Sequence, residues 1–297
     1  MFFTTLHKMN KRLPFFFLLL FFIANSLFGQ FIGPEKGSLV IVGGNARIAP
    51  KVFKKFIDLA GGPTANIVII PTANGGRDFG PAYQGNVYPN FQQHGAENLQ
   101  ILHTDDRAVA NSADFIKPVQ EATAVWFMGG RQWRLADAYL NTKTQEALQD
   151  LLNRGGVIGG SSAGATILGS YLVRGDTKTN TIMMGDHEVG FGFLKNSAID
   201  QHLLRRNRQF DLIEVIKAKP DLLGIGLDEG TAIVVKGNSF EVLGVSFVAI
   251  YDPTIMTDHT PFYLLGDGDL FDLGDRKAYR KGSKFNEIEL PRTLKND

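Results

Sequence analysis

A serine flanked by small residues stands near the middle of the sequence. Gly160-Ser161-Ser162-Ala163-Gly164 has the pattern Gly-X-Ser-X-Gly, and it directly follows an apolar run at residues 157–159. In a nucleophile elbow the serine occupies a sharp turn between a strand and a helix, where only small neighbours fit. The positive end of the following helix then faces the serine oxygen. The pattern therefore predicts that Ser162 is a nucleophile for acyl transfer.

A serine nucleophile needs a base, and the base needs an acid that orients it. Residue types alone do not choose the base, because five histidines follow residue 30: His94, His103, His187, His202 and His259. His202 precedes an amphipathic run at residues 203–217, and His187 lies between Asp186 and Glu188. The pair Asp228-Glu229 follows an apolar run, so these acids are candidates for the orienting group or for simple turn residues.

The elements that must position these residues alternate between strands and helices. Continuous apolar runs predict strands at residues 38–42, 66–70, 99–102, 124–128 and 156–159, and apolar faces predict helices at 50–60 and 144–153. Thr142 and Gln145 are expected to form a capping box at the second helix. Strands that are apolar on both faces belong to a parallel sheet covered by helices on both sides. Ligands bind beyond the carboxyl ends of such strands, where Gly43-Gly44 and Gly129-Gly130 stand here.

The pattern changes after residue 220. Short apolar runs at residues 225–228, 232–235, 240–243 and 245–250 predict an antiparallel extension of the same sheet. Beyond about residue 260 the chain is polar, and Gly266-Asp267-Gly268-Asp269 fits a pair of turns better than a calcium loop. No linker marks a second domain, so residues 30–297 are expected to form a single α/β domain with a C-terminal extension.

Composition excludes several classes of protein. The chain is 44% hydrophobic and carries 31 basic and 30 acidic residues, so it is neither disordered nor basic enough for a nucleic-acid partner. It has no cysteine, which excludes disulfides, thiolate metal sites and a cysteine nucleophile. Histidines and acids are too scattered in the sequence for a ligand cluster. No metal and no organic cofactor is expected.

The N-terminus has the pattern of a secretory signal. Lys8, Lys11 and Arg12 precede an apolar run at residues 13–23, and small residues follow up to Gly29. The apolar run is shorter than the ~20 residues of a membrane-spanning helix. We expect cleavage near residues 29–30, which would change the formal net charge from +1 to −2. The protein is therefore expected to be exported to the periplasm or the medium, with no stable membrane association.

Four blocks of the sequence together resemble a known family. They are Phe127-Met128-Gly129-Gly130-Arg131-Gln132, Gly160-Ser161-Ser162-Ala163-Gly164-Ala165, Ile199-Asp200-Gln201-His202 and Gly226-Leu227-Asp228-Glu229-Gly230-Thr231-Ala232. In order and spacing they are similar to cyanophycinases and their relatives in serine peptidase family S51, which include α-aspartyl dipeptidases. The likeness covers about residues 38–243. It implies a fold similar to that of class I glutamine amidotransferases, a flavodoxin-like parallel sheet, with serine in place of cysteine.

The resemblance also implies residue roles. Ser162 matches the nucleophile, His202 the base and Glu229 the acid that orients the base. The backbone N–H groups of Gly130 and Ala163 match the oxyanion hole. Five further residues match substrate-side positions: Gln132, Asp200, Gln201, Arg206 and Arg208.

Three residues depart from the family pattern. Arg131 stands where Asp or Asn is usual, Ser161 replaces a usual Thr, and Asp211 stands where a further basic residue is expected. These departures leave the chemistry intact and bear on the choice of substrate.

The resemblance implies an exported serine exopeptidase. Its expected substrates are cyanophycin or β-aspartyl dipeptide units, cleaved through an acyl-enzyme. Two alternatives stay open: an α-aspartyl dipeptidase, and a catalytically silent binding protein of the same fold. The expected partner is an aspartyl peptide, and a homodimer is an assembly to test.

Overall fold

The computed structural model describes residues 31–76 and 78–281. The chain divides into two units, Met1–Phe31 and Ile32–Asp297, and every described helix and strand belongs to the second. The expected signal at residues 1–29 lies outside the described residues. Within the described ranges, no helix has both the length and the apolar character needed to cross a membrane.

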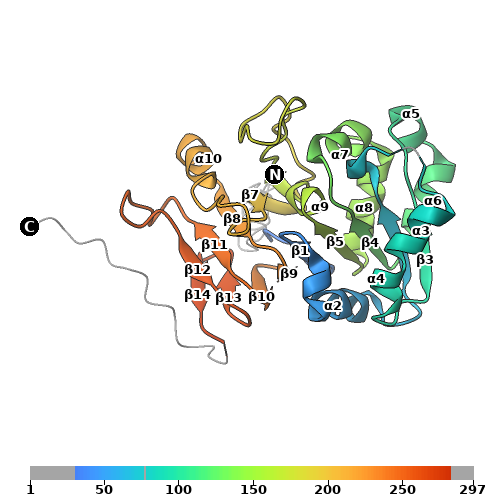
Figure 1. Cartoon of the computed structure of the whole chain (residues 1–297), viewed down its shortest axis with the longest axis horizontal. Coiled ribbons are helices and arrows are strands. Elements are labelled where there is room, and N and C mark those ends of the chain that lie inside the picture. Colours follow the sequence, from blue (N-terminus) through green and yellow to red (C-terminus); the bar gives the residue numbers. More distant parts are fainter. Residues whose placement is uncertain (1–30, 77, 282–297) are drawn as a thin grey trace, which may run out of the picture. The chain divides into compact units, whose positions relative to one another are not determined.

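The larger sheet has a parallel centre. Its strand order is β14-β13-β10-β9-β1-β5-β4-β2-β3, and the five strands from β1 to β3 in that order run parallel (Figure 1). The bounds of these five are β1 (Ser38–Val42), β5 (Val157–Ser161), β4 (Ala124–Phe127), β2 (Asn66–Ile70) and β3 (Asn98–Ile101). All five expected strands are present within one or two residues. The carboxyl ends of β1, β4 and β5 are therefore neighbours.

Helices cover both faces of the parallel part of this sheet. Alternate residues of each strand therefore enter two separate hydrophobic cores. Val40 and Trp126 pack on the face covered by α2 (Pro50–Ala60) and α4 (Pro89–Gln92). Ile41 and Phe127 pack on the opposite face. That face is covered by α6 (Ala113–Glu121), α7 (Gln132–Tyr139) and α8 (Lys143–Asn153). Burial on both sides explains why the strands are continuous apolar runs.

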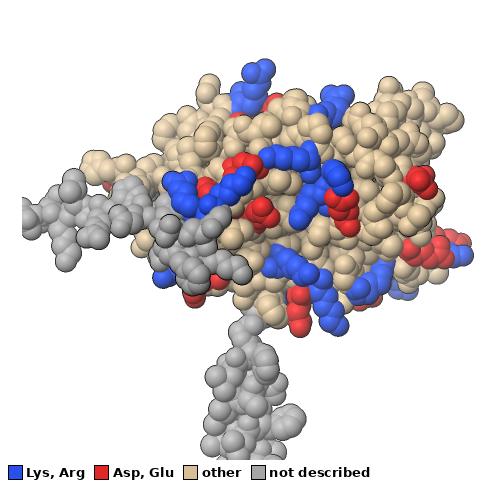
Figure 2. Space-filling view, turned by 90° about the horizontal axis from the view of Figure 1, so that it is seen from below, with Lys and Arg blue, Asp and Glu red and all other residues tan. Residues whose placement is uncertain are grey.

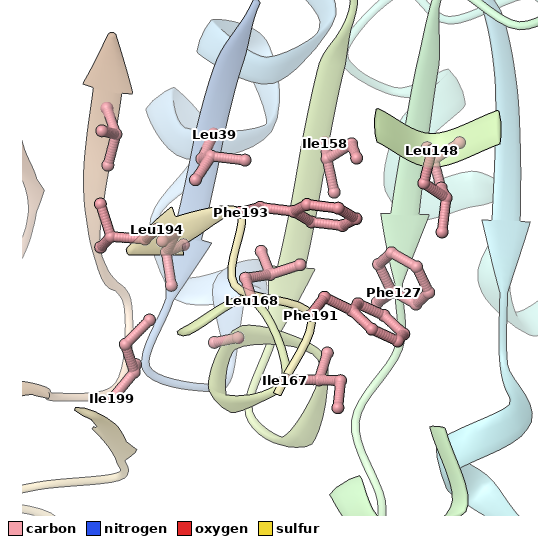
Figure 3. Packing of buried hydrophobic residues seen from close by; sticks show 14 of the residues in the cluster. Leu39, Phe127, Leu148, Ile158, Ile167, Leu168, Phe191, Phe193, Leu194 and Ile199 are labelled. Atoms are coloured by element: carbon pink, nitrogen blue, oxygen red, sulfur yellow. The ribbon is translucent and has the colours of Figure 1, made fainter. Parts of the chain in front are cut away.

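One aromatic group fixes the segment that follows the central serine. Phe127 of β4 lies beside Phe191, and Phe191 beside Phe193, with ring centroids 5.6 and 5.4 Å apart. Figure 3 shows these rings against Ile158 of β5 and the Ile167–Leu168 turn. The packing ties both ends of the loop at residues 172–193 to the parallel sheet.

The C-terminal part corrects one expectation. β9 (Thr231–Lys236), β10 (Ser239–Gly244), β13 (Leu270–Asp272) and β14 (Lys277–Tyr279) extend the first sheet in antiparallel order, as predicted. The strands expected at 225–228 and 245–250 do not belong to it. They form β8 (Leu223–Leu227) and β11 (Val248–Tyr251) of a second sheet, in the order β12-β11-β8-β7-β6. β8 pairs in parallel with β7 (Leu194–Gln201), so its partner comes from earlier in the chain.

Two local expectations also differ from the structure. The amphipathic run at 203–217 is a series of turns followed by a short helix, α10 (Leu212–Ala218). The capping box is not formed, because the Thr142 hydroxyl donates to the Tyr139 carbonyl and Gln145 instead accepts from the Asn141 N–H. The acidic segment at 266–269 is a turn closed by Asp269, which accepts from the Gly266 N–H. It joins β12 (Tyr263–Leu265) to β13.

The remaining elements are short. They are η1 (Ala46–Ile48), η2 (Thr72–Asn74), α3 (Pro81–Val87), α5 (Arg107–Ala110), α9 (Ala163–Thr166) and β6 (Gly169–Tyr171).

Candidate active site

Ser162 occupies a strained turn between β5 and α9. Its φ is +58° and its ψ −117°, a conformation that residues with a side chain rarely adopt. Its N–H donates to the Val42 carbonyl of β1. A side chain at Gly160 would meet the Gly164 carbonyl at 2.1 Å, and one at Gly164 would meet the Phe127 carbonyl at 2.2 Å. The small residues of the pattern are therefore needed for the turn.

The structure brings Ser162, His202 and Glu229 together. The Ser162 Oγ lies 2.9 Å from His202 Nε2, and His202 Nδ1 lies 2.7 Å from Glu229 Oε1. Ser162 follows β5 of the first sheet, whereas His202 follows β7 and Glu229 follows β8 of the second. The chain of hydrogen bonds thus joins the two sheets at their carboxyl ends. This is the arrangement that a serine, a general base and an orienting acid require.

The glycines after β1 make room for the histidine. A Cβ on Gly44 would lie 2.3 Å from Cε1 of His202, and the His202 N–H donates to the Gly43 carbonyl. Gly44 has a φ of +139°. The expectation that Gly-Gly strand ends surround the chemistry therefore has a steric basis in this pair.

Burial tunes the ionisation of His202. The ring is largely removed from water, which lowers its pKa below the ordinary value because the charged imidazolium is disfavoured. The Glu229 carboxylate opposes this shift, while the cations of Arg206 and Arg208 add to it. The net result is a neutral ring near neutral pH, and a neutral ring can accept a proton.

Glu229 remains a carboxylate. Burial alone would raise its pKa, but hydrogen bonds from His202 and from the Asn45 amide lower the pKa below its usual value. Asn45 Nδ2 lies 3.2 Å from Glu229 Oε2, so both carboxylate oxygens have donors. The acid is held in the ionised form that stabilises an imidazolium.

Gly130 and Ala163, the residues matched to the oxyanion hole, follow β4 and Ser162 respectively. Gly130, with a φ of +145°, follows β4, and a Cβ there would lie 2.0 Å from the Ala73 carbonyl. Gly129 approaches the Ser162 side chain, since its Cβ would lie 3.7 Å from Oγ. Within residues 31–76 and 78–281, the N–H groups of Gly130 and Ala163 donate no hydrogen bond. Both N–H groups therefore remain available as donors.

The five expected substrate-side residues fall into two groups. Gln132 is buried, and its amide donates to the carbonyls of Val173 and Arg174. Asp200 is fully buried; its carboxylate accepts from the Arg174 guanidinium and the Gln201 N–H. These side chains hold the 172–193 loop and the end of β7, and the protein itself engages the Gln132 NH₂ group and both Asp200 oxygens.

The other three lie on or near an open cavity. Arg208 donates to the carbonyl and the side-chain oxygen of Gln201. Arg206 is exposed, and no hydrogen bond or ion pair of its guanidinium occurs in the described part of the chain. A cavity of about 580 Å³ is lined by Arg174, Thr181, Met183, Arg206, Arg208, Phe210, Asp211 and Glu214. Both cations and carboxylates line it.

Arg174 is the residue that sequence reasoning missed. It is 2% exposed, has a φ of +55°, and pairs with Asp200 at 2.8 Å and with Asp211. No local pattern marks it, because its partners lie 26 and 37 residues away. Asp211, which departs from the family pattern, is thus the partner of this buried arginine.

The remaining histidines lie elsewhere. His187 bridges Asp186 and Asp137, His103 contacts the Thr72 hydroxyl, and His94 stacks on Phe53. His202 is the histidine found against the serine in the described structure. In those same residues, no group of three or more His, Cys, Asp or Glu side chains could hold a metal ion.

Comparisons with known proteins agree with this geometry. The model of peptidase family S51 matches residues 39–243. The chain is 33% identical over 225 residues to the cyanophycinase of Geminocystis herdmanii, covering 74% of this chain and 81% of that protein. It is 34% identical over 229 residues to the cyanophycinase of Trichormus variabilis, covering 75% of each. A crystal structure of a peptidase from an acI-B1 Actinobacterium has a TM-score of 0.63 at 23% identity, covering 81% of this chain and 98% of that chain.

A parallel α/β sheet that presents a serine on a strand-to-helix turn defines a serine-type hydrolase. The chain belongs to peptidase family S51. It is a serine-type peptidase similar to the cyanophycinases, and the resemblance drawn from its sequence blocks is confirmed.

Proposed function

We propose that this protein is an exported serine exopeptidase that cleaves cyanophycin or β-aspartyl dipeptide units. Ser162, His202 and Glu229 are its catalytic residues. The observation that carries the proposal is the unbroken set of hydrogen bonds from Glu229 through His202 to Ser162, at 2.7 and 2.9 Å.

The reaction begins when His202 Nε2 takes the proton of the Ser162 hydroxyl. The serine oxygen attacks an amide carbonyl next to an aspartyl residue, and the N–H groups of Gly130 and Ala163 hold the oxyanion. The imidazolium, stabilised by Glu229, gives its proton to the leaving amine, so an acyl-enzyme forms on Ser162. Water, deprotonated by His202, then attacks the acyl carbon. The bond to the Ser162 oxygen breaks, the imidazolium returns its proton to that oxygen, and the acid is released.

The cavity lined by Arg206 and Arg208 supports an aspartyl substrate. Cyanophycin has a poly-aspartate backbone with arginine on each β-carboxyl group, and two similar proteins are named cyanophycinases. Arg206 offers a guanidinium for an aspartyl carboxylate, with Arg208 behind it, and such pairs are bidentate when the geometry allows. The carboxylates of Asp211 and Glu214 face the same cavity, which suits a substrate that also carries a cation.

The decisive test is the release of β-Asp-Arg from purified cyanophycin. We expect the wild-type protein to produce this dipeptide and the Ser162→Ala variant to produce none. Hydrolysis of α-linked Asp-X dipeptides with no release from cyanophycin would instead establish the α-aspartyl dipeptidase alternative.

A fluorophosphonate probe tests the nucleophile without a known substrate. The Ser162 oxygen displaces fluoride from phosphorus, and His202 takes the serine proton. Labelling of the wild type and not of Ser162→Ala is the expected result. Absence of labelling in both would favour a silent binding protein.

The arginines can be separated by single substitutions. Arg206→Ala is expected to raise KM for substrates with a free aspartyl carboxylate and to matter less for amidated analogues. Arg205, exposed on the same turn and outside the lining of the cavity, is the matched control. Equal small effects at Arg205, Arg206 and Arg208 would mean that the basic run is a solvated surface.

Export is part of the proposal and rests on the pattern of residues 1–29. N-terminal sequencing of protein recovered outside the cytoplasm is expected to begin near residue 30. A chain that retains Met1 in the cytoplasm would overturn the export proposal and leave the chemistry untouched. Sedimentation of the same mature protein tests whether it forms a homodimer.

A further inference from the structure

Asp228, the residue before the proposed catalytic acid, is engaged on both carboxylate oxygens. Its Oδ1 accepts from the N–H groups of Leu204 and Arg205, at 3.0 and 2.9 Å. Its Oδ2 accepts from the Ser246 hydroxyl at 2.7 Å. The residue is 7% exposed, and so its carboxylate is aimed at the protein and away from substrate.

The turn that Asp228 binds begins at His202. His202 has a φ of +55°, which costs on the order of 1–3 kcal/mol for a residue with a side chain unless its surroundings enforce it. Every N–H from 202 to 206 has an acceptor. His202 donates to the Gly43 carbonyl, Leu203 to the Leu227 carbonyl, and Arg206 to the His202 carbonyl. The Asp228 carboxylate accepts the remaining two, which are the N–H groups of Leu204 and Arg205.

Two neighbouring residues after the end of β8 contact His202 and the turn that follows it. Glu229 contacts the ring of His202, while its neighbour Asp228 holds the backbone that follows His202. A carboxylate that accepts two backbone N–H groups makes charge-assisted hydrogen bonds, which are stronger and shorter than neutral ones. The same turn carries Arg206, which lines the cavity described above.

We propose that Asp228 is a positioning residue for the reaction, whose carboxylate fixes the turn at residues 203–206 and thereby the placement of the His202 ring against Ser162. The inference rests on the proposed function, because it assumes that His202 is the base. Asp228 itself touches neither substrate nor reacting atoms.

Asp252 provides a matched control. It is 1% exposed, stands directly after β11 of the same sheet, and its Oδ1 accepts from the Thr254 N–H at 3.0 Å and from Arg276 at 2.9 Å. It is therefore also a buried carboxylate that caps a turn. None of its hydrogen bonds reaches the serine, the histidine or their neighbours, so it reports the cost of disturbing such a cap alone.

The experiment separates geometry from charge in the full chain. Asp228→Asn retains an oxygen for the two N–H groups and an amide that can donate to Ser246, so kcat should stay within several-fold of wild type. Asp228→Glu keeps the charge but lengthens the side chain by one carbon–carbon bond, ~1.5 Å. A displacement of the base on that scale is expected to lower kcat by ~10- to 100-fold. The fluorophosphonate labelling rate of Ser162 should fall in parallel.

The pH profile gives a second readout. In Asp228→Glu the loosened ring gains water, so the acid limb of kcat/KM should move to higher pH. The charged groups around the ring, Glu229, Arg206 and Arg208, are unchanged in all variants. Asp252→Glu should lower the melting temperature without changing kcat, the labelling rate or the acid limb.

Wild-type kcat and labelling in Asp228→Glu would overturn the inference, and so would an Asn variant as slow as the Glu variant. If Asp228→Glu does not fold, Asp228→Ala, which removes the acceptors without adding volume, takes its place with the same expected loss. The proposed function fails separately, if wild type and Ser162→Ala behave alike. If the wild type is active and Ser162→Ala is inactive, the proposed function holds. The role of Asp228 is then decided by the Asp228 variants alone.

Discussion

Ser162 and His202 are two residues with side chains that the fold holds at positive φ, +58° and +55°. Such conformations persist only where neighbouring hydrogen bonds and packing enforce them, and they concentrate at functional sites. In both cases the N–H of the strained residue donates to a carbonyl at the end of β1 or just after it: Val42 for the serine and Gly43 for the histidine. One strand end therefore aligns the backbone of both residues.

Replacement of Ser162 by alanine should abolish hydrolysis and leave the fold in place. Serine and alanine have the same backbone strain at position 162, and the residue that loses its hydroxyl is only half-buried. The free energy of unfolding should therefore change by about 1 kcal/mol or less. Turnover and thermal melting check both parts. Ser161→Ala is the control and should keep its activity. A dead Ser161 variant beside an active Ser162 variant would move the nucleophile by one residue.

The pH dependence should reflect the lowered pKa of His202. Only the neutral ring accepts the serine proton, so the acid limb of kcat/KM is expected below pH 6.5, the ordinary value. Removing a nearby cation by Arg206→Ala should move this limb to higher pH. The contribution of His202 to the free energy of unfolding should also decrease at acid pH. The unfolded histidine binds a proton first, so the contribution of His202 is present above pH 6.5 and is lost as pH falls through the folded pKa. An acid limb above pH 6.5 would contradict the assignment.

Glu229→Gln should lower turnover strongly and change KM little. The amide keeps the shape of the side chain but cannot stabilise the imidazolium that forms during attack. Asn45→Gly, which removes the second donor to the carboxylate at a position with a φ of +43°, should have a much smaller effect. Steady-state kinetics of both variants provide the comparison, and a Gln variant that loses only affinity would exclude Glu229 as the orienting acid.

At the scale of elements, the sequence predicts those whose signal is local. The apolar runs of β1, β2 and β4 and the amphipathic face of α2 were readable because each is buried on the faces its pattern indicates. The second sheet could not be predicted from the sequence. β8 is as apolar as the strands of the first sheet, and nothing within it shows that β7 is its partner.

The turn from β4 into α7 should tolerate no side chain at Gly130. An alanine there would need a φ near +145° and would place its Cβ 2.0 Å from the Ala73 carbonyl. We expect Gly130→Ala to lose activity and to be destabilised by more than ~1 kcal/mol. Gly61→Ala is the control, since Gly61 also has a positive φ, +111°, but its Cβ would meet nothing within 4 Å. Similar melting temperatures and activities in both variants would contradict the steric argument.

At the scale of the molecule, the sequence located the site better than it described the contacts in it. The strand ends and the family blocks placed Ser162, His202 and Glu229, and the structure brings them together. Gln132 and Asp200 lie near the site, but the Gln132 NH₂ group and the Asp200 carboxylate make internal hydrogen bonds. Arg174 had no signal, because an ion pair across distant segments leaves no local pattern. Surface charge is mixed, and Figure 2 shows both signs interspersed over one face.

The origin of the site in two sheets has a consequence for local opening of the fold. Ser162 follows β5 of the first sheet, while His202 and Glu229 follow β7 and β8 of the second. A covalent adduct on Ser162 that also contacts His202 would link the two sheets. Local opening of either sheet would then require the loss of this link. Amide hydrogen exchange should then slow in β7 and β8 as well as in β5, whereas exchange at the distant edge strand β3 should not change. Slowing confined to β5 would mean that the adduct does not couple the two sheets.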